Sequence, residues 1–378
     1  MPLGRTSRLP SLAGLRFVAA AAVVGQHSSL IWTHGQGESA TLLRLGFAAV
    51  SFFFLLSGFL LTWAWRPGQP VRVFWRRRVA RILPSHLATL SVGVLLLAAA
   101  GQAVPLHAWL PNALLVQTWS PHFDLLDPGV NGVSWSLCCD LAFYLLFPLV
   151  ARRAAAIRPE RLGYWALAAV AAVVLVPLLV TAARPLLDGP PFGLGVTQRQ
   201  IWLSYAFPPA RMPEFLLGVV LARLVREGRL DRVRTWHGAV AFTLLYPLDQ
   251  LAPLMFGIAA IPVLPLAALI AGTANADRLD RPCWLAHPAA ERLGALSMTL
   301  YLVHFLVIEH GDALLDPYGT ADGLQPLLFT VVLVAGSLAA AWLLNVTVEE
   351  PMVRLLNEPR RTRPAELLTT ADHQRETP

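Results

Sequence analysis

The chain has 378 residues, of which 56% are hydrophobic and only 14% are charged. Because a soluble domain carries about 25% charged residues, these figures and a mean hydropathy of +0.55 exclude an ordinary soluble protein. The net charge of +7 does not indicate nucleic-acid binding, because the arginines lie in short segments between long apolar runs. The composition therefore predicts an all-α, polytopic helix bundle in a lipid bilayer.

About ten apolar segments are long enough, or nearly so, to span a membrane. They cover residues 12–32, 45–65, 84–103, 134–150, 163–182, 203–224, 237–251, 253–273, 293–309 and 324–347. The seventh and eighth are the weakest, because Pro247, Asp249 and Pro253 separate them, and a re-entrant pair is the alternative. Residues 1–357 are predicted to form one membrane domain, and the polar residues 358–378 a disordered cytoplasmic tail.

Arginine-rich segments precede the first predicted span and follow every second one. The segments between them are acidic or neutral, as around Glu38, Asp124 and Glu309. Because cytoplasmic loops carry the excess of basic residues, this alternation predicts an even number of spans with both termini in the cytoplasm.

The first predicted span contains two ionisable residues, Arg16 and His27. Such residues are costly in hydrocarbon, so they mark a functional site by default. The two are eleven residues apart, which is about three helical turns and roughly 16 Å along one face. The predicted topology puts Arg16 near the cytoplasmic surface and His27 near the outer surface.

Asp140 lies in the outer part of the fourth predicted span, which runs inward from about Ser134. Its depth is therefore similar to that of His27, and we predict that the two side chains form a working pair. A carboxylate beside an imidazole fixes the tautomer and raises the basicity of the ring, as general-base catalysis requires. The alternative is that Asp140 pairs with an arginine or faces a wet cavity.

Three further polar features lie inside predicted spans. Arg211 and Glu214 are three residues apart, and an ion pair with a structural or substrate-orienting role is favoured over catalysis. Tyr301 and His304 have the same spacing and fall near the expected depth of His27, so a site role and hydrogen-bonded packing are equal alternatives. Ser57 offers a hydroxyl nucleophile, although a small residue at a helix crossing is the favoured interpretation.

The strongest basic cluster is VRVFWRRRVARILP, at residues 71–84. On a helix Arg77 and Arg81 would share a face, with Arg78 beside them, and arginine forks suit phosphate groups. A topogenic or lipid-headgroup patch is the alternative. The three cysteines show neither zinc nor disulfide spacing, so we expect no metal and no permanently bound cofactor.

Seven segments follow one another along nearly the whole chain. They are RLPSLAGLRFVAAAAVVGQH (8–27), SFFFLLSGFLL (51–61), FWRRRVARILP (74–84), NGVSWSLCCDLAFYLLFP (131–148), PPARMPEFLLG (208–218), LGALSMTLYLVHFLVI (293–308) and VEEP (348–351). In this order they resemble the bacterial membrane acyltransferase family 3. Its members transfer acyl groups, usually acetyl, from cytoplasmic acyl-coenzyme A to hydroxyls of sugars and other acceptors. The chain is similar to compact members without a periplasmic hydrolase-like domain, including those that acylate macrolide antibiotics.

The resemblance assigns roles to particular residues. It implies that Arg16 and His27 are the paired essential residues of the first helix, and that Arg78 and Arg81 engage the acyl donor, with Arg77 beside them. Asp140 stands where the family usually has glutamate after the segment that begins at Trp135. The departure keeps the carboxylate but shortens its reach. Trp135 itself is taken as a substrate-binding or structural residue.

Together these observations predict an integral O-acyltransferase of the bacterial inner membrane, with acyl-coenzyme A as co-substrate and a sugar, glycan or macrolide-type acceptor. His27 would act as general base oriented by Asp140, while Arg16 would position the acyl arm. No serine or cysteine has an obvious adjacent base, so direct transfer is favoured, with an acyl-His27 intermediate as the alternative. No nucleic-acid partner is expected, and a homodimer is one option for the assembly.

The rival interpretation is a transporter that exports a glycan or a lipid-linked intermediate. Ten spans and buried charges suit it equally well. Many transporters, however, consist of two related halves, and we find no repeat between the halves of this chain. A scaffold subunit is a third interpretation, but it leaves the intramembrane Arg16, His27 and Asp140 without a role.

Overall fold

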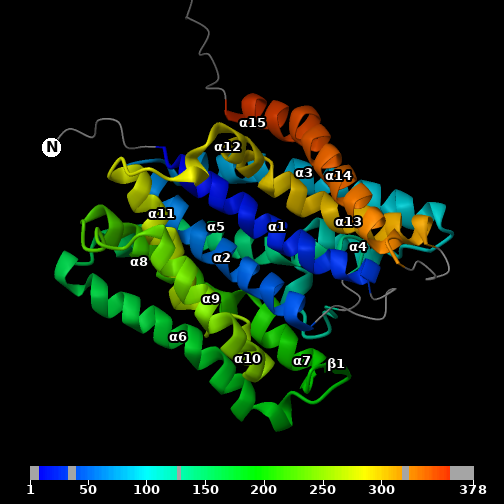
Figure 1. Cartoon of the computed structure of the whole chain (residues 1–378), viewed down its shortest axis with the longest axis horizontal. Helices are drawn as coiled ribbons and strands as arrows, with labels where there is room; N and C mark the ends of the chain where they lie inside the picture. Colours follow the sequence, from blue (N-terminus) through cyan, green and yellow to red (C-terminus); the bar gives the residue numbers. More distant parts are fainter. Residues whose placement is uncertain (1–7, 33–39, 126–128, 317–322, 358–378) are drawn as a thin grey trace, which may run out of the picture.

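The structure is a computed structural model that describes residues 8–32, 40–125, 129–316 and 323–357 (Figure 1). It is nearly all-α, as predicted. One short antiparallel hairpin joins β1 (Pro191–Gly193) to β2 (Val196–Thr197). The predicted tail, residues 358–378, lies outside the described residues.

The α-helices follow in chain order as α1 (Pro10–Trp32), α2 (Ala40–Ala64), α3 (Val71–Ala99), α4 (Leu106–Ala113), α5 (Trp135–Ala155), α6 (Leu162–Ala182), α7 (Gln198–Ile201), α8 (Pro208–Arg226), α9 (Thr235–Leu251), α10 (Leu254–Gly257), α11 (Val263–Arg278), α12 (Pro288–Ala295), α13 (Ser297–Leu315), α14 (Gln325–Leu344) and α15 (Glu350–Asn357). Shorter 3₁₀ turns are η1 (Gln117–Trp119), η2 (Gly132–Ser134), η3 (Pro159–Arg161), η4 (Arg184–Leu186) and η6 (Trp284–Ala286). Two π-helical turns are η5 (Trp202–Ala206) and η7 (Asn345–Glu349).

In the described part of the chain, six helices are long and apolar enough to cross a membrane. They are Leu42–Ala64, Val71–Ala99, Gly132–Ala155, Pro159–Ala182, Ser297–Leu315 and Gln325–Leu356. Each overlaps a predicted span. The other four predicted spans are also largely helical, as α1, as η5 with α8, as α9, and as α10 with α11. These helices are shorter or carry more polar residues, as α1 does with Arg16 and His27.

Two predicted spans have different boundaries in the structure. The third was expected to begin at Pro84, but α3 begins at Val71 and includes the basic cluster in one helix of 29 residues. The eighth is broken, because the chain turns at residues 258–262 between α10 and α11. After α14, the chain continues through the π-helical turn η7 into α15, beyond the predicted end of the last span.

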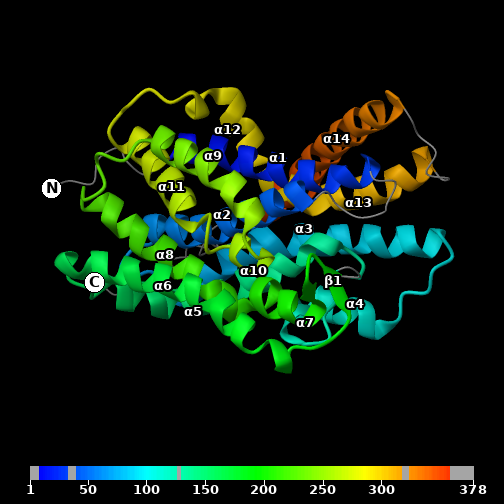
Figure 2. The same cartoon turned by 60° about the horizontal axis from the view of Figure 1, so that its bottom comes forward.

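The helices are stacked so that five of them surround one region. Figure 2 shows α2 and α3 below α1 and α13 and above α5. Helix α1 packs against α2 and α13, and α3 packs against both α13 and α5. Segments that are far apart in the sequence therefore meet between these layers.

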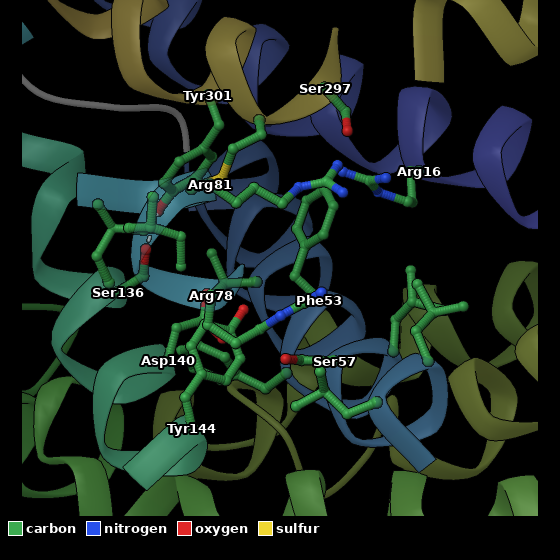
Figure 3. A pocket seen from close by; sticks show the side chains of 18 residues that line it. Arg16, Phe53, Ser57, Arg78, Arg81, Ser136, Asp140, Tyr144, Ser297 and Tyr301 are labelled. Carbon is green, nitrogen blue, oxygen red and sulfur yellow. Dashed lines mark hydrogen bonds between the residues drawn. The ribbon is translucent and has the colours of Figure 1, made fainter. Parts of the chain in front are cut away.

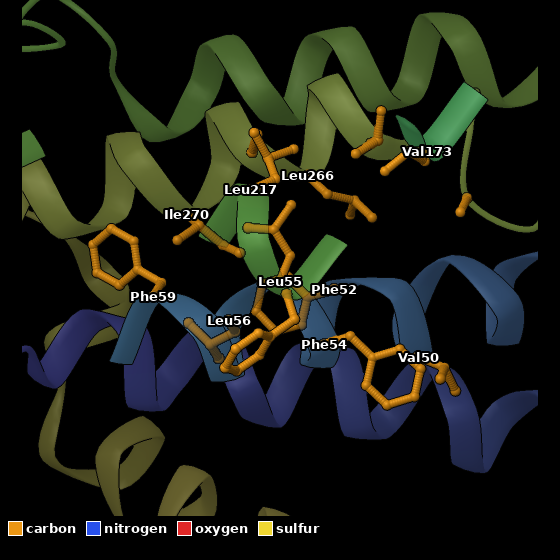
Figure 4. Packing of buried hydrophobic residues seen from close by; sticks show 14 of the residues in the cluster. Val50, Phe52, Phe54, Leu55, Leu56, Phe59, Val173, Leu217, Leu266 and Ile270 are labelled. Atoms are coloured by element: carbon orange, nitrogen blue, oxygen red, sulfur yellow. The ribbon is translucent and has the colours of Figure 1, made fainter. Parts of the chain in front are cut away.

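The contact between α2 and α8 is unusually close because glycine lies on both sides. A Cβ atom at Gly58 would lie 2.0 Å from the carbonyl oxygen of Phe215, and one at Gly218 would lie 1.9 Å from that of Leu55. Around this crossing, large side chains of α2 pack against α8 and α11 (Figure 4). They include Phe54, Leu55, Leu56 and Phe59 of α2, Leu217 of α8, and Leu266 and Ile270 of α11. The missing side chains thus allow the backbones to approach, as is common between membrane helices.

Two arginines in the last turn of α8 bind carbonyl groups at the ends of other helices. Arg223 donates to the carbonyl oxygens of Ala154 and Ile157 at the end of α5, and Arg226 donates to that of Trp63 near the end of α2. The last carbonyl groups of a helix lack partners within it, so cationic donors stabilise these ends.

Replacing Gly58 with alanine should destabilise the protein, because the added methyl group meets backbone that only a shift of α2 or α8 can remove. We expect a lower thermal unfolding midpoint, corresponding to about 1–3 kcal/mol. The matched control is Gly163→Ala in α6, where a Cβ atom would meet nothing within 4 Å. That control should melt at or slightly above the wild-type temperature, since alanine favours the helix. Equal melting of both variants would contradict the close crossing.

Candidate active site

A cavity with a volume of about 160 Å³ lies between α1, α2, α3, α5 and α13. Its walls are mainly apolar, and its polar lining is shown in Figure 3: Arg16, Ser57, Arg78, Arg81, Ser136, Asp140, Tyr144, Ser297 and Tyr301. Six of these nine residues were predicted as site residues from the sequence alone.

Three guanidinium groups enter the cavity. Arg16 comes from α1, whereas Arg78 and Arg81 come from one face of α3. Figure 3 shows the guanidinium ends of Arg16 and Arg81 pointing toward one another. Arg78 also lies over the ring of Phe74, 5.9 Å from its centroid. A mainly apolar cavity with three cations at one end is suited to a ligand that carries several negative charges and an uncharged arm.

Arg77 is exposed and does not line the cavity. The expected pair, Arg77 with Arg81, is therefore replaced by Arg78 with Arg81. The reason is the stripe of α3 that packs inward, in which Phe74 and Ile82 are buried on the same side as Arg78 and Arg81. These apolar neighbours were the sequence signal that distinguishes the two faces.

Carboxylates accompany two of the cavity arginines. Asp140 lies beside the hydroxyl of Ser57 and the charge of Arg78. Glu349, in the turn η7, lies 3.7 Å from Arg81, measured from Oε1 to Nε. Ser57 thus faces the cavity, and its neighbour Gly58 makes the helix crossing to which Ser57 was assigned.

His27 contacts another histidine. Its Nδ1 lies 3.1 Å from Nε2 of His304, and 3.1 Å from the carbonyl oxygen of Val23 one turn earlier. Nδ1 of His304 lies 3.0 Å from the carbonyl oxygen of Leu300. A carbonyl oxygen only accepts, so a neutral His304 carries its proton on Nδ1 and presents Nε2 as acceptor. His27 then donates from Nδ1, and its basic lone pair is on Nε2.

The predicted pairing of His27 with Asp140 is not among these contacts. A depth inferred from loop charges does not determine which neighbours a side chain meets. Asp140 turns toward α2 and α3, where Ser57 and Arg78 lie, whereas His27 turns toward α13. The imidazole is oriented by His304, which the sequence had placed only as a candidate neighbour.

Tyr301 lies between the cavity and the histidine pair. It lines the cavity, and its ring centroid is 5.8 Å from that of His304. Its hydroxyl is 2.7 Å from Oγ of Ser136 and donates to the carbonyl oxygen of Val133 at 3.1 Å. Tyr301 therefore links the cavity lining to His304, which contacts His27.

Arg211 and Glu214 form a buried ion pair outside the cavity, with Nε of Arg211 3.1 Å from Oε2 of Glu214. The Arg211 side chain also donates to Oγ of Ser51 at 2.7 Å and lies over the rings of Phe54 and Tyr205. These contacts fit the structural alternative, because the pair supports Phe54, which lines the cavity.

Trp135 is also buried behind the cavity wall. Its ring packs against that of Tyr205, at 4.4 Å between centroids, and against that of Phe54 at 6.3 Å. The structural role is thus supported by its contacts, as it is for Arg211. By contrast Ser136, Tyr144 and Glu349 were not predicted as site residues, although each lies in a motif that was recognised.

Comparisons with known proteins give a consistent family. A model of an acyltransferase domain matches residues 9–346. Acyltransferase MdmB of Streptomyces mycarofaciens is 38% identical over 374 residues, which cover 94% of this chain and 94% of MdmB. Peptidoglycan O-acetyltransferase OatA of Listeria monocytogenes is 28% identical over 156 residues, covering 37% of this chain and 24% of OatA. Putative peptidoglycan O-acetyltransferase YrhL of Bacillus subtilis is 30% identical over 157 residues, 37% of this chain and 23% of YrhL. No solved structure matches.

Proposed function

The chain belongs to acyltransferase family 3, and we propose that it transfers an acyl group, typically acetyl, from acyl-coenzyme A to a hydroxyl of its acceptor. Its membership makes it an acyltransferase and a multi-pass membrane protein. The observation that supports the finer proposal is the cavity lined by three arginines, whose lining residue Tyr301 lies against His304 of the histidine pair.

We propose a topology of ten spans in a bacterial inner membrane, with both termini in the cytoplasm. Support comes from the helices found at all ten predicted spans and from the basic ends of α5, α8 and α11. In this topology the arginine end of the cavity is near the cytoplasm, where acyl-coenzyme A is made. His27 is then roughly 16 Å farther along α1.

The donor would bind with its phosphates at Arg16, Arg78 and Arg81. Coenzyme A carries a diphosphate and a 3′-phosphate, and guanidinium groups bind phosphate oxygens through paired N–H donors. Its uncharged pantetheine arm would follow the apolar walls toward Tyr301, along side chains such as Val50 and Leu60. Asp140 would hold Arg78 in place. In this proposal the carboxylate therefore belongs to the donor site, and it does not orient His27.

The chemical step would use Nε2 of His27 as the general base. The acceptor hydroxyl gives its proton to Nε2 while its oxygen attacks the thioester carbonyl carbon. The carbon–sulfur bond then breaks, and the thiolate of coenzyme A takes the proton from His27. His304 keeps the other proton of His27 on Nδ1 and so acts as a positioning residue. Such general-base assistance contributes about 10²- to 10⁴-fold in rate.

Direct transfer fits the arrangement better than a serine intermediate. Ser57 lies beside Asp140, but the charge of that carboxylate is shared with Arg78, which weakens it as a base for a serine nucleophile. For the acceptor we propose a hydroxyl of a sugar, glycan or macrolide-type molecule. The name of OatA specifies peptidoglycan, but that likeness covers 37% of this chain, against 94% for MdmB.

Replacing His27 with alanine should strongly reduce transfer, because it removes the proposed general base. Membranes that contain the wild-type protein should move labelled acetyl from acetyl-coenzyme A to a hydroxyl acceptor, and the variant should lose about 10²- to 10⁴-fold in rate. The matched control is His310→Ala, a second histidine of α13 that contacts a carbonyl oxygen one turn earlier. It should retain activity. Normal turnover by His27→Ala, with equal membrane insertion, would refute the assignment.

Replacing Arg78 and Arg81 together with glutamine should raise the KM for the acyl donor by about ten- to a hundredfold, because charge-assisted contacts to phosphate are lost. The KM for the acceptor should stay near its wild-type value. Arg76→Gln, an exposed arginine of the same helix, is the matched control and should change neither constant. An unchanged donor KM in the double variant would contradict donor binding by these arginines and would favour the alternative, in which they only set the membrane topology.

A further inference from the structure

Glu349 is a buried acidic residue that the proposed mechanism does not use. It belongs to the VEEP motif and ends the π-helical turn η7. Its side chain is 8% exposed, whereas that of the adjacent Glu350 is 47% exposed. Burying a carboxylate is costly unless a cation compensates for it, so the surroundings of Glu349 must supply one.

The compensating charges come from the donor end of the cavity. Oε1 of Glu349 lies 3.7 Å from Nε of Arg81, and the charge of Arg16 also acts on this carboxylate. Oε2 is buried and has no hydrogen-bond partner among the described residues. Glu349 thus serves two arginines that come from different helices.

The geometry leaves these arginines able to bind a ligand. Glu349 approaches Arg81 at Nε, the guanidinium nitrogen nearest the backbone. The terminal edge of the Arg81 guanidinium points onward to Arg16 inside the cavity (Figure 3). Two guanidinium groups this close repel one another, and a carboxylate beside both offsets the repulsion. Without it, Arg81, which is 41% exposed, could swing out of the cavity.

The backbone turn gives Glu349 its direction. π-Helical turns are rare and frequently occur at functional sites. Both η7 and α15 pack against α3, the helix that carries Arg81. One residue later the chain faces outward, where Glu350 accepts hydrogen bonds from Asn345 at 3.1 Å and Arg354 at 2.7 Å.

We infer that Glu349 is a positioning residue of the donor site, which holds Arg81 and Arg16 together so that both can meet the donor's phosphates. This inference rests on the proposed function, because it assumes that these arginines bind acyl-coenzyme A. The inference gives a role to the VEEP motif, whose Glu349 contacts Arg81 of the basic cluster although the two segments are more than 260 residues apart in the sequence.

The test is a set of steady-state measurements with acetyl-coenzyme A in membranes that contain the full chain. Glu349→Gln should raise the donor KM by about tenfold, with kcat within about twofold of the wild-type value. Glu349→Asp keeps the charge at a shorter reach and should give an intermediate KM. Glu350→Gln makes the same charge change one residue away, outside the cavity, and should leave both constants unchanged.

A second measurement separates positioning from a merely structural effect. In an Arg81→Gln background, Glu349→Gln should raise the donor KM by less than about twofold, because its main partner is already gone. An equal rise in both backgrounds, or no rise in the wild-type background, would overturn the inference. If Glu349→Gln fails to insert, the comparison of Glu349→Asp with Glu350→Gln decides by the same criterion. Absence of any acyl-coenzyme A-dependent transfer by the wild-type protein would instead refute the proposed function.

Discussion

Three guanidinium groups enter one cavity of an apolar helix bundle, and the arrangement of the site depends on how their charge is compensated. A cation inside a membrane protein needs a carboxylate, a carbonyl group or water nearby. Arg78 has Asp140 beside it, while Arg81 and Arg16 share the charge of Glu349. The carboxylates come from α5 and from the turn after α14, so compensation ties together segments that are distant in the sequence. In the proposed function the same three cations bind the anionic donor.

The second constraint is the distance between this cationic end and the histidine pair. Helix α1 carries both Arg16 and His27, and α13 carries Ser297 and Tyr301 in the cavity wall before it reaches His304. In the proposed reaction this separation has a use. The charged part of the donor is held at the arginines, and only its uncharged arm needs to pass Tyr301. In this account, an acyl group from the cytoplasm reaches His27 only if the donor's uncharged arm can pass Tyr301.

Much of this arrangement could be predicted from the sequence, because buried charge in apolar segments is conspicuous. Every predicted span contains helix, and Arg16, Arg78, Arg81, Asp140, Ser57 and Tyr301 line one cavity. The failures share one physical cause. Loop charges and residue counts give depth, but they do not determine the direction in which a side chain points around its helix. For that reason the sequence paired His27 with Asp140, whereas the ring of His27 contacts His304, and it included Arg77, which does not line the cavity. Glu349 was missed because it follows the last span, in a π-helical turn that no periodicity predicts.

The most direct test of the account is a structure of the protein in a lipid environment with a non-hydrolysable acetyl-coenzyme A analogue. The account predicts phosphate groups at hydrogen-bond distance from Arg16, Arg78 and Arg81. It also predicts the thioester-equivalent carbonyl beyond Tyr301, so that an acceptor hydroxyl bound between it and Nε2 of His27 can approach the carbonyl carbon to about 3–3.5 Å. An analogue bound outside the cavity, or one whose acyl end lies away from both histidines, would contradict the central claim that one cavity joins the donor site to the catalytic base.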